Sequence, residues 1–187
     1  MSNDLQDILT SGTLTRMEKI LVTNSLSSKG ETIVRFLRNL DFLVVGVDKW
    51  EEKEKNGASS FFRVNLKHPD SVKLVYTLTQ PTTIVYPWIP IQDGLLYPDY
   101  SSIEFFNLVT IGVKRGVKKV ILCLDINLTA ETSVEMQQLL LHSMIYDFAA
   151  KLGIEFLVVT SNDNLLKSIK RFLKGGKNES DDKSRSS

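Results

Sequence analysis

The 187-residue sequence is poor in the side chains that build disulfide frameworks or metal sites. Cys123 is the single cysteine, which excludes an internal disulfide and is typical of a reducing compartment. The two histidines, His68 and His142, show no metal-ligand spacing with each other or with Cys123. The sequence therefore predicts no metal site.

The sequence also lacks an excess of charge of one sign and a long apolar run. It has 23 Lys and Arg against 22 Asp and Glu, a net charge of +1, which argues against a dedicated nucleic-acid binder. A membrane span needs about 18 consecutive apolar residues, and no such run exists. Residues 1–7 carry acids where a signal peptide needs positive charge, so we expect a cytoplasmic protein.

Compact apolar runs alternate with stretches of helical period. Continuous rather than alternating hydrophobicity is typical of strands buried on both faces, as in a parallel sheet. This pattern predicts a three-layer α/β fold, a Rossmann-like doubly wound parallel sheet of about six strands. The expected strands are 19–23, 42–48, 61–66, 82–86, 119–124 and 154–160, and the expected helices are 31–40, 69–79, 101–115, 132–152 and 163–174.

Composition also suggests the limits of the domain. We expect an N-terminal arm over 1–18, a single domain over 19–174 and a disordered tail over 175–187, which lacks apolar residues. The charged stretch 48–60 predicts an exposed loop. The prolines of 87–98 predict a segment that forms neither regular helix nor central strand.

The segment after the first expected strand carries a family resemblance. Val22–Leu37 (VTNSLSSKGETIVRFL) resembles the Thr-Gly-x-x-x-Gly-x-Gly loop and first helix of the short-chain dehydrogenase/reductase family. The first two glycines of that motif fall on Asn24 and Ser28, and the third is Gly30. Asparagine tolerates the positive φ of a tight turn, whereas a serine side chain intrudes where a pyrophosphate would approach. The helix N-terminus and the loop hydroxyls, including that of Ser25, still suit an anion.

The resemblance implies a nucleotide site in which NAD or NADP would not be held tightly. Asp48 ends the second expected strand, where the family places its ribose-binding acid, and Asn65 stands where an Asp often contacts adenine. The alternative for Asp48 is that it only opens a charged loop. The candidate cofactor-binding residues are Asn24, Ser25, Ser28, Gly30, Asp48 and Asn65.

The family's catalytic residues are mostly missing at matching positions. Asn107 matches the asparagine of the family's catalytic tetrad. The serine expected at the end of the fifth strand is absent, because the sequence there reads Cys123-Leu124-Asp125. The positions of the Tyr-x-x-x-Lys motif fall on Val134–Gln138, where neither the tyrosine nor the lysine is present. Tyr146 and Lys151 are five residues apart, so they point to different faces of a helix. Because the Tyr supplies the proton and the Lys lowers its pKa, we predict no catalytic residues and no hydride transfer by the usual mechanism.

We therefore expect a degenerate, non-enzymatic relative of the family, shortened after the sixth strand, that acts as a binding or scaffolding subunit. One alternative is a divergent NAD(P)-dependent oxidoreductase or sugar-epimerase-like enzyme that uses Asn107 and Asp125. Another is a structural subunit, because 84–90 (IVYPWIP) resembles a strand in the structural subdomain of polyketide-synthase ketoreductases. Tyr86 and Trp88 are bulky where an active enzyme has small residues, and would narrow the cofactor channel.

The helix expected over 132–152 is apolar at more positions than one core stripe requires, above all in 139–152. In the resembling family the equivalent helix pairs with the preceding one across a two-fold axis, and Phe105 and Phe106 fit such a role. We expect a homodimer, or a heterodimer with an active relative, through helices 101–115 and 132–152. The alternative is that 1–16 or the proline-rich segment covers this face.

Overall fold

The computed structural model describes residues 18–50, 57–87, 100–123, 147–159 and 164–175. Within these ranges six strands form one sheet in the order β3-β2-β1-β4-β5-β6, and every neighbouring pair is parallel. This is the strand order of a doubly wound Rossmann sheet, as expected. The strands are β1 (Lys19–Thr23), β2 (Leu43–Asp48), β3 (Ser60–Arg63), β4 (Thr83–Pro87), β5 (Lys119–Cys123) and β6 (Glu155–Val159).

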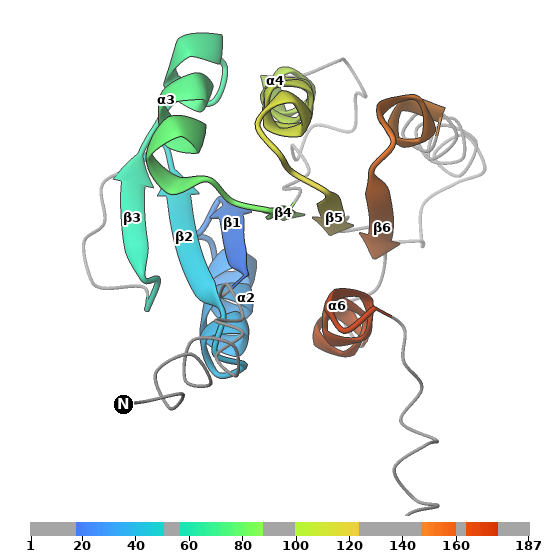
Figure 1. Ribbon diagram of the computed structural model, residues 1–187. Coiled ribbons are helices and arrows are strands. Elements are labelled where there is room, and N and C mark those ends of the chain that lie inside the picture. The colour runs from blue at the N-terminus through green and yellow to red at the C-terminus, as the bar shows by residue number, and fades with distance from the viewer. Residues whose placement is uncertain (1–17, 51–56, 88–99, 124–146, 160–163, 176–187) are drawn as a thin grey trace, which may run out of the picture.

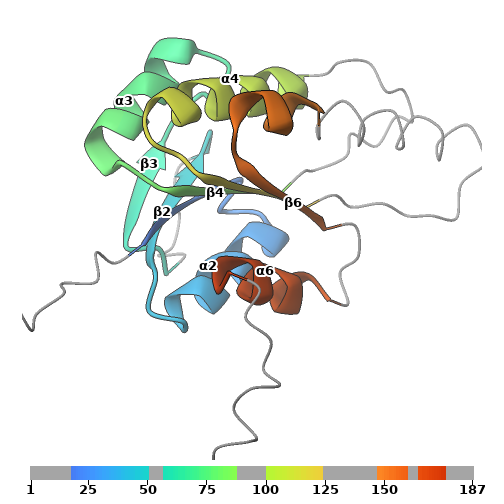
Figure 2. The same ribbon diagram turned by 45° about the vertical axis from the view of Figure 1, so that its right-hand side comes forward.

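Helices cover both faces of the sheet and complete three layers (Figures 1 and 2). On one face lie α2 (Ser28–Arg38) and α6 (Leu165–Leu173), and on the other lie α3 (Pro69–Thr79), α4 (Tyr100–Lys114) and the helical residues 147–152. The chain changes from one side of β1 to the other when it passes from β3 to β4. That reversal between β1 and β4 is the topological switch point, outside which ligands bind in folds of this kind.

The strand hydrophobicity is continuous because each strand has core on both sides. In β1, Leu21 belongs to the cluster under α3 and α4, while Ile20 and Val22 belong to the cluster under α2 and α6. β5 follows the same alternation, with Leu122 on the first side and Cys123 on the second. Side chains of a strand alternate between its faces, so both sets must be apolar in a three-layer fold.

The helices have local signals that match their ends and faces. The hydroxyl of Ser27 caps α2, and Pro69 opens α3, where its missing N–H is not needed. α6 buries Leu165, Ile169 and Leu173, which recur every four residues, so its lysines and arginine occupy the other face.

The structure corrects two sequence expectations about loops and strands. Pro87 is the last residue of β4, a central strand, and pairs in register with Cys123 of β5. Because β4 ends at Pro87, no later residue of the strand depends on the hydrogen bond that the proline cannot donate. The third strand starts at Ser60, inside the expected loop, and ends at Arg63 rather than at residue 66.

Other expectations fall on residues outside the described ranges. These are the arm over 1–17, the tail beyond 175, and the part of the 132–152 helix that precedes 147. Among the helices that the structure describes, none combines the length and the apolar character needed to cross a membrane.

Candidate functional site

The loop after β1 is a tight turn that bonds to itself. Asn24 has a φ of 46°, so the asparagine that replaces the first glycine adopts the left-handed conformation anticipated for it. The hydroxyl of Ser27 donates to the carbonyl of Asn24 at 2.7 Å and accepts from the N–H of Gly30 at 3.0 Å. The N–H of the buried Ser25 donates to the carbonyl of Val47 in β2 at 3.3 Å. Neighbouring protein atoms thus satisfy these loop donors.

Gly30 is required by close packing between the loop and α2. A Cβ at this position would lie 2.0 Å from the carbonyl oxygen of Asn24 and 2.9 Å from the Cα of Ser25, both backbone atoms that cannot step aside. The third glycine of a Rossmann loop serves close packing of helix on strand. The one glycine retained here therefore has a structural reason to be present.

Asp48 lies at the carboxyl end of β2 and is 6% exposed. Its Oδ2 accepts a hydrogen bond from the N–H of Leu26 at 3.1 Å, and its Oδ1 accepts one from the N–H of Trp50 at 3.2 Å. The residue stands where the resemblance places a ribose-binding acid. Both carboxylate oxygens, however, already accept hydrogen bonds from backbone N–H groups of the protein itself.

A side-chain hydrogen bond crosses the switch point. The Nδ2 of Asn24 donates to the carbonyl of Pro87 at 2.9 Å, which joins the carboxyl ends of β1 and β4. Asn24 and Asp48 together tie the ends of three neighbouring strands, β2, β1 and β4, to the loop between β1 and α2.

Of the two remaining candidate residues, one begins α2 and the other follows β3. Ser28 is the exposed first residue of α2. Asn65 follows β3, and its Oδ1 accepts from the N–H of Lys67 at 3.1 Å. Asn65 therefore belongs to the connection between β3 and α3. Asn24, Ser25, Ser28 and Gly30 instead lie together in the loop after β1 and the first turn of α2.

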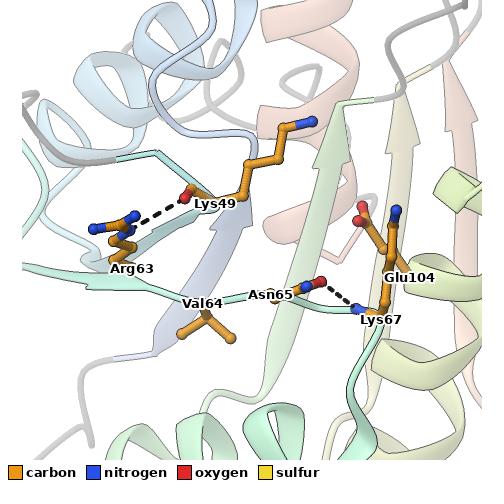
Figure 3. A pocket seen from close by; sticks show the side chains of 6 residues that line it. All are labelled: Lys49, Arg63, Val64, Asn65, Lys67 and Glu104. Atoms are coloured by element: carbon orange, nitrogen blue, oxygen red, sulfur yellow. Dashed lines mark hydrogen bonds between the residues drawn. The ribbon is translucent and has the colours of Figure 1, made fainter.

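Asn65 lines a cavity of about 380 Å³ at the carboxyl ends of β2 and β3 (Figure 3). Arg63 is anchored there by a bond from its Nε to the carbonyl of Lys49, at 3.4 Å. Sequence analysis missed the charged residues of this cavity. A signal was available for two of them, because Lys49 and Lys67 directly follow the expected strands 42–48 and 61–66. The lining residues are Lys49, Arg63, Val64, Asn65, Lys67 and Glu104.

Asn107, which the resemblance matches to the asparagine of the family's catalytic tetrad, makes hydrogen bonds within the fold. Its Nδ2 donates to the carbonyls of Leu66 and Lys67, at 3.2 and 3.0 Å, and so fastens α4 to the connection between β3 and α3. Lys151 lies exposed in the helical residues before β6. Asp125, Val134–Gln138 and Tyr146 lie outside the described residues, as do Trp88 and His142.

Two aromatic residues have roles other than those expected. The ring of Tyr86 is fully buried in the core and packs edge-on against Phe105, with centroids 5.4 Å apart, so it does not narrow a channel at the sheet edge. Phe105 is 1% exposed and cannot contribute to a dimer surface, whereas its neighbour Phe106 is 40% exposed. The direction of each side chain on α4 decides this difference.

Cys123 is a buried free cysteine. Burial raises the pKa of its thiol to about 12, and the positive charge of Lys29 opposes that rise only in part. A thiol with this pKa carries almost no thiolate near neutral pH, so it is not a nucleophile there. Within the described residues no three His, Cys, Asp or Glu side chains come together as metal ligands would.

Comparisons with known proteins identify the fold but do not identify an activity. No family profile and no curated protein sequence matches the chain. Solved structures do match. UDP-glucose 4-epimerase from Thermus thermophilus, in complex with NAD, aligns over 76% of this chain and 54% of its own with a TM-score of 0.61 and 16% identity. The UDP-glucose 4-epimerase from Stenotrophomonas maltophila, with bound NAD, aligns over 76% and 52% with a TM-score of 0.62 and 14% identity.

A short-chain dehydrogenase/reductase superfamily protein from Agrobacterium tumefaciens, with bound NAD, aligns over 76% of this chain and 48% of its own, with a TM-score of 0.59 and 13% identity. The chain thus spans about half the length of these structures. The similarity to ketoreductase structural subdomains stays a prediction. In its fold, this chain is a Rossmann-like doubly wound α/β domain, similar in structure to these NAD-bound proteins.

Proposed function

We propose that this chain is a binding or scaffolding subunit that performs no hydride transfer. One observation carries the proposal: Asn24 and Asp48, which stand where a dinucleotide would be held, bond instead to Pro87, Leu26 and Trp50. The polar groups at the switch point thereby stabilise the protein itself. The loss of the tetrad serine, tyrosine and lysine from the sequence agrees with this role.

The closed loop makes dinucleotide binding unfavourable. A Rossmann loop holds a pyrophosphate with backbone N–H groups at the helix N-terminus and a ribose with the acid after the second strand. In this chain the N–H of Gly30 donates to Ser27, and the N–H of Leu26 donates to Asp48. The bond to the Asp48 carboxylate, a charged group, contributes about 1.5–3 kcal/mol, so a cofactor that takes this acid would first have to displace a contact of that strength.

The exposed part of α4 supports an interaction role. Ile103 is 47% exposed and Phe106 is 40% exposed. Phe106 also packs edge-on against Phe148 of the helical residues 147–152, with centroids 5.2 Å apart. An apolar surface shared by two adjacent helices suits the homodimer or heterodimer that the sequence predicts.

Calorimetric titration with NADH and NADPH tests the proposal. We expect no heat of binding at millimolar cofactor. Micromolar binding that weakens in Asp48→Asn, with an unchanged circular dichroism spectrum, would overturn it. Asp70→Asn is the matched control, because Asp70 is an exposed carboxylate on α3.

The cavity beside β2 and β3 favours a second candidate, a divergent NAD(P)-dependent oxidoreductase or epimerase. This cavity adjoins the strand that ends in Asp48 and is lined by Asn65, one of the nucleotide-site candidates. The same titration separates the two candidates, since an enzyme of this kind must bind its dinucleotide.

A further inference from the structure

The outer face of α3 exposes two large apolar side chains. Leu74 is 58% exposed and Leu78 is 59% exposed. They are four residues apart, so they lie on one face of the helix. α3 stands at the end of its helix layer, with α4 on one side of it (Figures 1 and 2). An exposed apolar pair at this spacing suits contact with the apolar stripe of a second helix.

The chain enters the sheet beside the last turn of α3. The Nζ of Lys19 donates to the carbonyl of Thr79, the last residue of that helix, at 3.1 Å. The hydroxyl of Thr83 donates to the Oε1 of Glu18 at 2.7 Å. These bonds fix the point at which residues 1–17 join the described fold. That point is next to the exposed leucines and on the same side of the sheet as α3.

The sequence of residues 1–9 has the pattern that such a face would receive. Leu5, Ile8 and Leu9 recur at the spacing of one helix face. The same stretch contains two acids, Asp4 and Asp7, and neither lysine nor arginine. A helix this short is marginal in water and needs a surface to pack on. The stretch therefore predicts an acidic amphipathic helix that forms against a partner surface.

The connecting residues are long enough for this contact. Residues 10–17 separate the apolar stripe from Glu18, and eight extended residues reach about 26 Å. α3 has 11 residues and is therefore about 16 Å long. A tether of this length gives the stripe an effective concentration on the order of millimolar at α3, which favours the same chain over a second copy.

Positive charge lies beside the exposed leucines. The Nη1 of Arg115 donates to the hydroxyl of Thr77 on α3 at 3.4 Å. The ion pair between Lys73 and Asp70 on α3 adds no net charge. A local excess of cations attracts the acids of residues 1–9. The exposed cations at the end of α4 are Lys114, Arg115 and Lys118.

We propose that residues 1–9 dock as an amphipathic helix on α3 of the same chain, with the apolar stripe against Leu74 and Leu78. The docked helix covers an apolar face that would otherwise contact water. Ile103 and Phe106 lie on α4 and stay available for self-association. The proposal goes beyond the proposed function, because it does not depend on whether the chain binds a dinucleotide.

Hydrogen exchange of the full chain, followed by mass spectrometry, tests the docking. We expect the amides of residues 1–9 to exchange at least about tenfold more slowly than in a synthetic peptide of the same residues. Leu78→Glu should remove this protection, because it places a carboxylate in an apolar contact and beside two acids. Phe106→Glu, also a charge at an exposed apolar position, is the control and should leave the protection unchanged.

A cross-link gives a second measurement. Ile8→Cys together with Leu78→Cys should form a disulfide within one chain under mild oxidation, because docking brings the two Cα atoms within about 7 Å. Ile8→Cys together with Phe106→Cys is the matched control and should stay reduced. The native Cys123 is 1% exposed, so it does not compete.

Several results would overturn the proposal. Exchange as fast as in the peptide would show that residues 1–9 do not dock, and protection unaffected by Leu78→Glu would show that they dock elsewhere. A disulfide between two chains, or protection that rises with protein concentration, would assign the occupant to a second copy. Tight NADPH binding that depends on Asp48 would contradict only the proposed function, so the two proposals fail separately.

Discussion

Asn24 donates a hydrogen bond of 2.9 Å from its side-chain amide to the backbone carbonyl of Pro87, and so joins the carboxyl ends of β1 and β4. These two strands are neighbours in the sheet, although 63 residues separate the bonded groups in the chain. The contact lies at the switch point of the doubly wound sheet, where Rossmann proteins bind their ligands. Here the same place is used to hold the loop after β1.

The Asn24 contact and its backbone conformation can be separated by two substitutions. Asn24→Ala removes the hydrogen bond to Pro87 and leaves an alanine, which disfavours positive φ, at a φ of 46°. We therefore expect it to lower the free energy of unfolding by about 2 kcal/mol. Asn24→Gly removes the bond alone and should cost about half as much. Urea denaturation measures both, and equal losses would show that the positive φ carries no cost.

Asp48 should matter for stability through its two backbone partners. Asp48→Ala leaves the N–H groups of Leu26 and Trp50 without their acceptor, so we expect a loss of about 3 kcal/mol of unfolding free energy. Asp48→Asn keeps one acceptor oxygen and should lose about half of that. Thermal denaturation checks both against Asp70→Asn, which should change stability by less than about 0.5 kcal/mol. If Asp48→Ala changed the stability as little as Asp70→Asn does, the two hydrogen bonds that Asp48 accepts would not stabilise the fold.

Gly30 should tolerate no side chain. In Gly30→Ala the new Cβ would lie 2.0 Å from the carbonyl oxygen of Asn24, so α2 must move away from the loop. We expect a loss of about 3 kcal/mol or more in unfolding free energy. Ser28→Ala, two residues earlier and exposed, is the matched control and should be nearly neutral. A Gly30→Ala variant as stable as the Ser28→Ala variant would contradict the close packing of the loop on α2.

Cys123 should make stability fall at alkaline pH. Burial raises its thiol pKa from the ordinary 9.0 to about 12, so between these values the unfolded chain releases a proton that the folded chain retains. Stability therefore falls as the pH rises through this window, by up to about 1.4 kcal/mol per pH unit, and this group contributes no pH dependence well below pH 9.

Urea denaturation at several values between about pH 8 and 10 measures this slope, which should be shallower in Cys123→Ala. A thiol reagent gives a second readout. It should label Cys123 slowly in the folded protein and quickly in urea, because the thiol is 1% exposed. Rapid labelling without urea would contradict the buried, protonated thiol.

The exposed apolar residues of α4 should control self-association. We expect sedimentation equilibrium to show a dimer that Phe106→Glu dissociates, because the charge would be buried between the subunits. Leu74→Glu on α3 is the control, since Leu74 is also exposed but lies on another helix. A monomer at all concentrations, or equal effects of the two substitutions, would exclude α4 as the interface.

Local pattern predicted most of the secondary structure. The helix expected over 69–79 is α3 with the same bounds, because Pro69 opens a helix and apolar residues recur at helical spacing after it. The continuous apolar runs correctly indicated six strands and a three-layer arrangement, since only strands buried on both faces have this composition. The resemblance of Val22–Leu37 to the dehydrogenase loop also pointed to the right fold.

The site depended on contacts between distant residues. Nothing in the local sequence shows that Asn24 meets Pro87, that Leu26 takes one oxygen of Asp48, or that the Phe105 ring turns into the core while Phe106 turns out. The cavity lined by Asn65 likewise exists only because β2 and β3 end side by side. Residue patterns along the chain specified the elements and their order, because period and burial act over a few residues. Packing in three dimensions selected which side chains meet at the sheet edge, because crossovers bring strand ends together from far apart in the chain.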